Sequence, residues 1–255
     1  MTLPPPPPPA LDKLQALVFD VFGTLADWRT GIAREAHAAL AAHGVVVDGA
    51  AFADGWRAQY QPAMEAVRSG RLPFCKLDVL HRRNLDRVLI DFGLDDLPDT
   101  ARANLNLAWH RLDGWPDVGP ALARLRQRFL IAPCSNGNVS LMVDLARRNA
   151  WHWDAILGAE IARDYKPKLE VYRAAASAFD CAPEQVLMVA AHSSDLAAAT
   201  QAGLRTAFVA RPDENGPGRG ERESSVVVDL SANDLGALAD RLLGIIGTGP
   251  TATPP

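Results

Sequence analysis

Four short hydrophobic runs divide the chain, and each has the composition of a buried strand. They are rich in Val, Leu, Ile, Ala and Phe, and each ends at polar residues or glycine. Strands of a parallel sheet are buried on both faces, so they are hydrophobic throughout rather than alternating. The four runs cover residues 14–20, 128–136, 186–192 and 205–210.

Amphipathic helical patterns lie between the last three of these runs. Residues 139–150 and 169–180 place apolar side chains three to four positions apart. The Ala-rich residues 195–203 end on Gly203, and glycine commonly terminates helices. Strands that alternate with helices predict an α/β fold built on a doubly wound parallel sheet with a Rossmann-like core.

Residues 29–112 depart from this alternation, because they contain four amphipathic helical patterns and no convincing strand. A helical block placed directly after the first strand predicts an inserted cap domain. The segment 113–120 then returns the chain to the sheet. The core domain is therefore predicted to comprise residues 14–28 and 113–246.

The two ends of the chain differ in composition from the rest. Residues 1–13 contain six consecutive prolines and predict a Pro-rich disordered arm, while residues 247–255 predict a disordered tail. No apolar run approaches the 18 or so residues that a membrane span needs, and no signal-peptide pattern is present.

The overall composition is that of an ordinary globular protein, with 48% hydrophobic and 22% charged residues. The net charge of −4 and the scattered arginines argue against a nucleic-acid partner. Three distant cysteines fit a reducing, cytoplasmic environment better than a disulfide framework.

Polar residues stand where the predicted strands end, which is where open α/β sheets bind their ligands. Each has a structural explanation of its own: a strand-end Asp often caps a turn, Ser-Asn-Gly is a common turn, and an Asp can be a helix N-cap. Their joint placement at corresponding strand ends favours a site. The strand-end residues are Asp20, Ser135, Asn136, His192 and Asp195, and Lys166, held before Pro167, follows the second strand in the same order along the chain.

The order Asp-x-x-Gly-Thr, Ser-Asn-Gly, Lys-Pro and a late Asp resembles the haloacid dehalogenase-like superfamily over about residues 15–240. Within it, the segments FDVFGTLADW, WRAQY, CSNGN, YKPKLEVY and TAFVARP resemble the L-2-haloacid dehalogenase family. The resemblance implies an α/β core with a helical cap, and a nucleophilic Asp20.

Two positions favour carbon–halogen over phosphate-ester chemistry. Phosphatases of this superfamily carry a second Asp two residues after the nucleophile, which protonates the leaving alkoxide, and they bind Mg²⁺. This chain has Phe22 at the first position and Ala191 where a later metal-binding Asp is usual. A halide leaves as a stable anion and needs no proton, so neither change hinders its displacement.

The resemblance also implies roles for the remaining residues. Asp20 would attack a short L-2-haloacid to form an ester that water then hydrolyses, without cofactor or metal. Lys166 would orient the Asp20 carboxylate, while Thr24 and Ser135 would bind that carboxylate or the substrate. Halide and substrate contacts would come from Phe22, Arg57, Asn136 and Tyr172.

The loop before Asp195 departs from the usual family pattern, in which a Ser and an Asn position the hydrolytic water. Ala190 and His192 occupy those positions here. Since imidazole has an ordinary pKa of about 6.5, His192 is a candidate base for the second step. The alternative is that His192 only supports the loop and Asp195 orders the water.

Two other functions stay open on the sequence. One is a Mg²⁺-dependent phosphatase of the same superfamily, which the missing acid at Phe22 disfavours. The other is a non-catalytic binding member, which the intact set of Asp20, Ser135, Lys166 and Asp195 disfavours. The predicted partner is a small 2-haloacid, with neither nucleic acid nor membrane, and a homodimer is possible.

Overall fold

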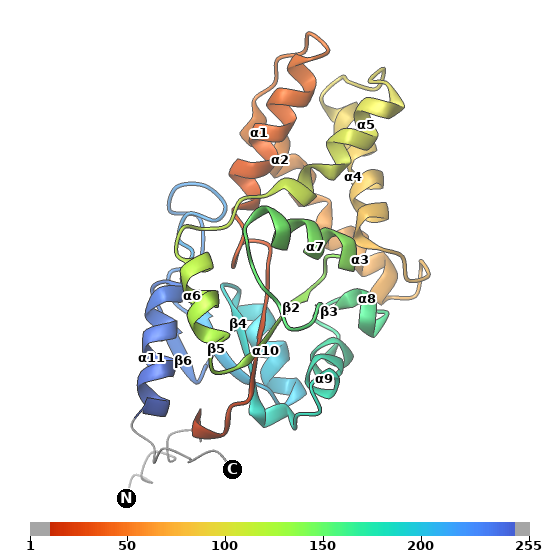
Figure 1. Ribbon diagram of the computed structural model, residues 1–255. Helices are drawn as coiled ribbons and strands as arrows, with labels where there is room; N and C mark the ends of the chain where they lie inside the picture. The colour runs from red at the N-terminus through yellow and green to blue at the C-terminus, as the bar shows by residue number, and fades with distance from the viewer. Residues whose placement is uncertain (1–10, 248–255) are drawn as a thin grey trace, which may run out of the picture.

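A six-stranded sheet forms the centre of the molecule, as the computed structural model, which describes residues 11–247, shows (Figure 1). Every pairing is parallel, and the strand order is β3-β2-β1-β4-β5-β6. The prediction of a doubly wound parallel sheet is confirmed. The strands are β1 (Ala16–Phe19), β2 (Leu130–Ser135), β3 (Leu157–Gly158), β4 (Val186–Ala190), β5 (Arg205–Val209) and β6 (Leu230–Ala232).

The four predicted strands correspond to β1, β2, β4 and β5. The two edge strands, β3 and β6, were not predicted, because two or three residues are too few to show a strand period. Both lie at the margins of the sheet, where each pairs on one side only. They add little to the hydrophobic pattern by which strands are recognised.

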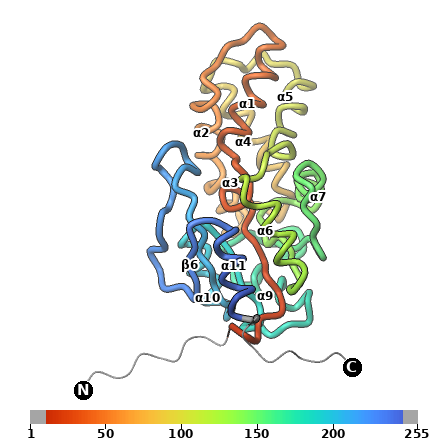
Figure 2. The backbone as a smooth tube through the Cα atoms, turned by 60° about the vertical axis from the view of Figure 1, so that its left-hand side comes forward, coloured from red at the N-terminus to blue at the C-terminus, as the bar shows by residue number. Residues whose placement is uncertain are grey.

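Helices cover both faces of the sheet because its side chains alternate between them. In β1, Leu17 and Phe19 point into one hydrophobic cluster, and Ala16 and Val18 into another. Figure 2 shows two helices of the first face, α6 and α11, side by side. The first face packs on α6 (Val118–Leu125), α7 (Val139–Arg148), α8 (Ala159–Ala162) and α11 (Leu235–Gly247); the second packs on α9 (Leu169–Ala178) and α10 (Ser193–Ala202).

A layer of helices stands beyond one end of the sheet (Figures 1 and 2). We call residues 28–111 the cap. Its residues form no strand, as the helical pattern at 29–112 predicted, while the division into two domains stays a prediction. The cap consists of α1 (Trp28–Ala41), α2 (Gly49–Ala58), α3 (Tyr60–Arg68), α4 (Leu77–Asp91), α5 (Asp99–Asn106) and the 3₁₀ helix η2 (Leu107–Arg111).

One of the four helical patterns in the cap runs over residues 52–70 and predicts a single helix, but the structure has two helices that meet at Gln59. Pro62 lies in the first turn of α3, where its missing N–H removes no helical hydrogen bond. In a continuous helix the same ring would clash with the preceding turn. The proline therefore favours a new helix, and the break places Arg57 and Tyr60 on either side of it.

The ends of the described chain correct one prediction. Residues 11–13 were predicted as part of a disordered arm, but they form a 3₁₀ helix in which Leu11 is buried. Hydrophobic burial of Leu11 against the core explains the difference. The rest of the predicted arm and the tail from 248 lie outside the described residues, and α11 ends at Gly247.

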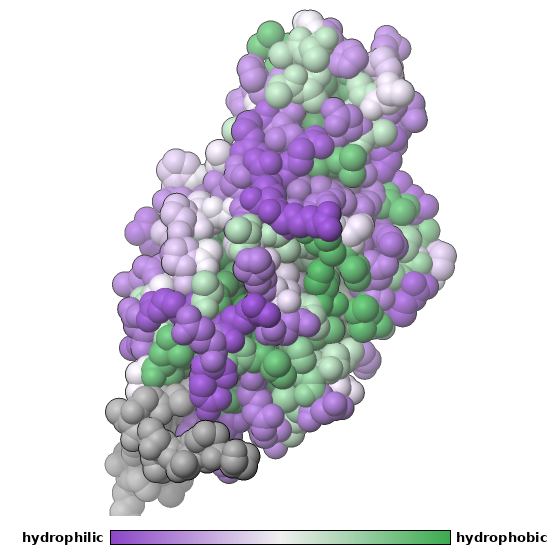
Figure 3. All heavy atoms as spheres, in the orientation of Figure 1, coloured by the Kyte–Doolittle hydropathy of each residue, from purple (hydrophilic) through white to green (hydrophobic). Residues whose placement is uncertain are grey.

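The surface shown in Figure 3 is mixed. Hydrophilic residues cover much of the cap on this face, and hydrophobic residues reach the surface in separate patches, most of them over the sheet-containing part. Within residues 11–247, no helix has the length and hydrophobicity that crossing a membrane would require.

Candidate active site

The site lies at the carboxyl ends of the central strands, where the chain crosses from one half of the sheet to the other. β1 pairs with β2 on one side and with β4 on the other, so the loops after β1 and β4 are neighbours. Asp20 follows β1 and His192 follows β4. This is the position at which open α/β sheets form binding crevices.

Asp20 is nearly buried, and both of its oxygens accept hydrogen bonds. Oδ1 accepts from Lys166 Nζ at 2.8 Å, and Oδ2 accepts from Thr24 Oγ1 at 2.7 Å and lies 3.0 Å from His192 Nδ1. Burial alone would raise the pKa of Asp20, but the charges of Lys166 and His192 hold it well below its ordinary value. The carboxylate is therefore ionised at neutral pH.

Lys166 lies between two carboxylates, and this explains why it stays charged although it is buried. Its Nζ is 2.8 Å from Asp20 Oδ1 and 2.5 Å from Asp195 Oδ2. Burial opposes the charged form, but the two carboxylates raise the pKa of Lys166 above its ordinary value. The ammonium group fixes the orientation of the Asp20 carboxylate.

The loop that carries Lys166 is held from both the core and the cap. The Lys166 backbone N–H donates to Asn136 Oδ1 at 2.9 Å, and the Lys166 carbonyl oxygen accepts from Arg68 Nη1 of α3 at 2.8 Å. Asn136 therefore presents its amide nitrogen, rather than its oxygen, for other contacts. The Lys166 loop and the cap meet at this point.

His192 lies between Asp20 and a second carboxylate, Glu214, in the loop after β5. His192 Nε2 is 2.9 Å from Glu214 Oε2, and Trp28 Nε1 donates to Glu214 Oε1 at 3.1 Å. Burial alone would lower the pKa of His192, but hydrogen bonds to Asp20 and Glu214 raise it to about 10. The ring is an imidazolium at neutral pH.

Gly23 allows Glu214 to approach this closely. Its φ of +88° is in the region that favours glycine, and a Cβ atom there would lie 2.0 Å from Glu214 Oε1. Both residues of the Gly-Thr pair after Asp20 thus support the site. Gly23 leaves room for the Glu214 carboxylate, and Thr24 donates to Asp20 while accepting from the backbone N–H of Ala191 at 2.9 Å.

A cavity of about 340 Å³ opens in front of these groups, between the core and the cap. Its volume suits a small organic acid. Core and cap residues both line it: Asp20, Phe22, Arg57, Tyr60, Gln61, Arg68, Asn136, Lys166, Pro167, His192, Ser194 and Asp195.

Arg57 brings a positive charge to this cavity. Its guanidinium carbon lies 4.2 Å from the Tyr60 ring centroid and 5.2 Å from that of Trp28. Its Nη1 is buried and has no hydrogen-bond partner within the part of the chain that the structure describes. Buried polar groups are normally hydrogen-bonded, so this donor is available to an anionic ligand.

Phe22 gives the cavity an apolar wall. It is 2% exposed and makes edge contacts with Tyr60, His81 and Trp109, at centroid distances of 6.4, 6.3 and 5.5 Å. Burial lowers the pKa of His81 to about 3, so that ring is neutral. The position that would carry an acid in a phosphatase is therefore packed into an aromatic cluster.

The structure places three predicted site residues behind the cavity rather than in it. Tyr172, predicted as a substrate contact, is fully buried, and its hydroxyl donates to Asp195 Oδ1. That prediction is corrected, because α9 lies on the far side of Asp195. Ser135 Oγ accepts from Gly137 N at 3.0 Å, and Thr24 contacts Asp20. None of the three lines the cavity.

Three further residues of the site, Glu214, Tyr60 and Arg68, were not predicted from the sequence. Glu214 follows the strand at 205–210. Open α/β sheets bind ligands where their strands end, so the reasoning that selected residues after the other strands could also have selected Glu214. Tyr60 and Arg68 gave no such signal. They reach the site only because α3 packs across the carboxyl ends of the strands.

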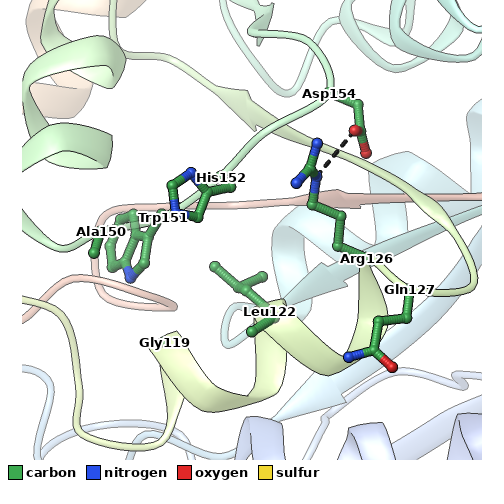
Figure 4. Close-up of a pocket in the computed structure, with 9 residues that line it drawn as sticks. Gly119, Leu122, Arg126, Gln127, Ala150, Trp151, His152 and Asp154 are labelled. Carbon is green, nitrogen blue, oxygen red and sulfur yellow. Dashed lines mark hydrogen bonds and ion pairs between the residues drawn. The ribbon is translucent and has the colours of Figure 1, made fainter.

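A second hollow, of about 260 Å³, is lined by α6 and by the segment that follows α7 (Figure 4). Leu122 and Trp151 are among the residues that line it, and Arg126 Nε donates to Asp154 Oδ1 at 3.0 Å within the same lining. Trp151 is 5% exposed and belongs to the main hydrophobic cluster. The hollow gathers no catalytic set.

The donor set of the site does not suit a divalent cation. Over residues 11–247, no cluster of three or more His, Cys, Asp or Glu residues is placed to hold a metal ion. The Lys166 ammonium lies between the Asp20 and Asp195 carboxylates, where a cation would compete with it. Ala191 has no oxygen in its side chain to offer.

Comparisons with known proteins identify the family to which this chain belongs. The family model described as "haloacid dehalogenase-like hydrolase" matches residues 14–203. The chain is 44% identical to the defluorinating L-2-haloacid dehalogenase Rha0230, with a TM-score of 0.88 over 90% of this chain and 95% of that one. It is 40% identical to the L-2-haloacid dehalogenase PA0810, with a TM-score of 0.86 over 91% and 99% of the two chains.

The chain is also similar to a curated dehalogenase. The chain is 28% identical to (S)-2-haloacid dehalogenase 1 of Pseudomonas sp. (strain CBS-3), over 79% of this chain and 86% of the relative. The resemblance predicted from the motifs is confirmed. The chain belongs to the L-2-haloacid dehalogenase family of the haloacid dehalogenase-like hydrolases.

Proposed function

We propose that this protein is a hydrolytic dehalogenase that converts short L-2-haloalkanoic acids into 2-hydroxy acids and halide, through an ester on Asp20 and without a metal. The observation that carries the proposal is an ionised carboxylate, Asp20, that Lys166 holds at the base of a small cavity. The same cavity contains the unpaired Arg57 donor and the apolar wall of Phe22.

In the first step, Asp20 Oδ1 attacks C2 of the substrate from the side opposite the halogen. Oδ1 accepts one hydrogen bond and Oδ2 contacts two groups, so Oδ1 retains more electron density for the attack. A bond forms between Oδ1 and C2, and the carbon–halogen bond breaks, which inverts C2. The halide leaves toward Arg57 and the amide nitrogen of Asn136.

In the second step, water attacks the Asp20 carboxyl carbon. The bond between that carbon and Oδ1 breaks, so Oδ1 leaves as the hydroxyl oxygen of the product and the water oxygen stays on Asp20. His192 and Asp195 flank this position. Tyr172 and Lys166 hold Asp195 in place.

Phosphate-ester hydrolysis fits the site less well. An alkoxide leaving group requires a proton, and Phe22 stands where the proton donor would be. A phosphate would also bring about two negative charges toward the ionised Asp20 and Asp195 with no divalent cation to balance them. A purely binding role would not require a carboxylate held in an attacking position.

Halide release from 2-chloropropionate enantiomers, chloroacetate and fluoroacetate tests the proposal, with p-nitrophenyl phosphate and Mg²⁺ as the comparison. Fluoroacetate belongs in the panel because one similar protein is a defluorinating enzyme. We expect halide release from the L enantiomer that persists in EDTA. Phosphate release that requires Mg²⁺, without halide release, would overturn the proposal.

Asp20→Asn is expected to abolish turnover, because an amide is a far weaker nucleophile than a carboxylate. The variant should retain its fold, since Asn still offers an oxygen to Lys166. Circular dichroism and halide release measured on the same sample check both points. Turnover within a factor of ten of wild type would exclude Asp20 as the nucleophile.

A further inference from the structure

His192 is enclosed by carboxylates on both of its ring nitrogens. We propose that Asp20 and Glu214 hold His192 as an imidazolium in the resting enzyme, and that conversion of Asp20 into a neutral ester releases the Nδ1 proton and turns His192 into a base for the second step only. This inference rests on the proposed function, and it assigns Glu214 as the residue that positions the ring.

The geometry calls for a proton between each ring nitrogen and the carboxylate that faces it. Nδ1 lies 3.0 Å from Asp20 Oδ2, and Nε2 lies 2.9 and 3.0 Å from the two oxygens of Glu214. A neutral imidazole has one N–H and one lone pair, so one nitrogen would face a carboxylate without a proton between them. Glu214 is 3% exposed and itself accepts from Trp28, which keeps it in place.

A resting imidazolium cannot accept a proton from water. It is nevertheless suited to the first step, because it keeps Asp20 ionised and oriented. Formation of the ester then removes the negative charge that faces Nδ1. Glu214 remains as the only carboxylate hydrogen-bonded to the ring within the described residues, and it holds the proton on Nε2.

The other acidic and basic side chains around the ring keep their charge when the ester forms. Lys166 is bound to the other oxygen of Asp20, and Asp195 is paired with Lys166. Glu221 accepts from the Ser193 backbone N–H at 3.1 Å, and Arg57 and Arg68 reach the cavity from the cap. Only Asp20 changes its charge when the ester forms.

The protons balance over one turnover. After ester formation the Nδ1 proton passes to solvent, which the ring reaches because its side chain is 25% exposed. Nδ1 then takes a proton from the attacking water, and the hydroxide oxygen bonds to the Asp20 carboxyl carbon. On collapse the departing alkoxide takes the other proton of that water. Asp20 returns as a carboxylate and His192 as an imidazolium, with one proton and one halide released.

Single-turnover experiments separate the two steps. The full-length enzyme, in excess, is mixed with L-2-chloropropionate, and rapid quenching gives the halide released and the ester mass on the Asp20 peptide. In His192→Gln we expect about one halide per substrate molecule, followed by ester hydrolysis slowed by roughly 10²–10⁴-fold, the usual contribution of a general base. Ester hydrolysis within threefold of wild type would overturn the proposal.

The pH dependence of ester hydrolysis tests whether Glu214 favours the charged form of the His192 ring. In wild type, ester hydrolysis should rise with pH and level off as the ring loses its proton, while ester formation stays constant from about pH 6 to 9 because Asp20 is ionised throughout. Glu214→Gln removes a carboxylate that favours the charged ring. Its hydrolysis profile should therefore shift to lower pH and reach a lower plateau.

Glu221→Gln is the matched control, because Glu221 lies in the same loop but contacts Ser193 rather than the ring. We expect its profile to coincide with that of wild type. An unshifted Glu214→Gln profile, or an equal shift in both variants, would contradict the proposal. Failure of wild type to release any halide in the first turnover would instead contradict the proposed function.

Discussion

Arg57 contributes a cation to the cavity, and aromatic rings rather than a carboxylate hold it there. Tyr60 and Trp28 lie within 5.2 Å of its guanidinium carbon, and these contacts orient the group without neutralising it. An anion that develops during the reaction therefore meets a full positive charge in a partly dehydrated setting. Such preorganised charge is a large contributor to catalysis.

Replacing Arg57 with Ala is expected to lower kcat by roughly 10–10³-fold, because the departing halide loses its charged donor. The thermal unfolding midpoint should change far less, since Trp56 and Phe52 anchor the same helix. Arg87→Ala, at an exposed position of α4, is the matched control. Wild-type kinetics in Arg57→Ala would remove Arg57 from the halide site.

His192 also links stability to pH. A group whose pKa is raised by folding stabilises the folded state fully below its unfolded pKa and loses that contribution as pH rises through the folded value. For His192 the interval runs from its ordinary pKa to about 10. The free energy of unfolding should therefore fall more steeply from pH 6.5 to 10 in wild type than in His192→Gln.

Urea denaturation of both proteins at pH 6, 8 and 9.5 measures this difference. The two proteins share every other titrating group, so the difference between their curves isolates the imidazole. Parallel curves would show that the ring gains no charge on folding.

At the scale of elements, the break between α2 and α3 is what brings cap residues to the site. α2 buries Phe52 and Trp56 and ends with Arg57 in its last turn, and α3 begins at Tyr60. A continuous helix would carry these side chains in other directions. The junction at Gln59 lets both Arg57 and Tyr60 contribute to one wall of the cavity.

The N-cap of α2 is expected to contribute to stability but not to catalysis. Asp48 Oδ1 accepts from the backbone N–H groups of Ala50 and Ala51, at 2.9 and 3.1 Å. Asp48→Ala should cost about 0.5–2 kcal/mol of stability, as loss of an N-cap usually does. The kcat should remain unchanged, because buried side chains hold the end of the helix that faces the cavity.

Chemical denaturation and steady-state kinetics on the same preparations check this expectation. Asp96→Ala, at an exposed position between α4 and α5, serves as the control for loss of a surface carboxylate. Equal stability of the two variants would mean that the N-cap contributes nothing to α2.

At the scale of the whole molecule, the cap and the core form one packed body around the cavity. One hydrophobic cluster contains Phe19 of the sheet and Leu85 of the cap. Polar contacts cross the same junction: Arg68 donates to the Lys166 carbonyl, and Tyr165 Oη donates to the Cys75 carbonyl at 2.8 Å. The position of the cap is thereby tied directly to the loop that carries Lys166.

Arg68→Ala is expected to lower kcat/KM by about 10-fold or more, since a hydrogen bond from a charged donor contributes about 1.5–3 kcal/mol. Arg71→Ala, at an exposed position just beyond α3, is the control. Initial rates of halide release across substrate concentrations separate the two variants. Matching values would show that the Arg68 contact does not hold the catalytic geometry.

Local patterns in the chain account for most of the core and for the reactive groups of the site. The continuous hydrophobic runs marked four strands, and the helical spacing at 139–150 and 169–180 marked α7 and α9, because both signals are local. The strand-end rule selected Asp20, His192 and Asp195, and the order of the motifs added Lys166; the structure brings these four into one connected set of contacts.

Long-range contacts decided the rest. Glu214 reaches His192 only because β5 ends beside β4 and Gly23 leaves room for the carboxylate. Tyr172 lies behind Asp195, and Tyr60 and Arg68 enter the cavity, because of how α9 and α3 pack. The sequence by itself determined the four longer strands, most helices and most of the reactive residue types, since those follow from local pattern. Tertiary packing decided the edge strands, which groups touch, and with what charge.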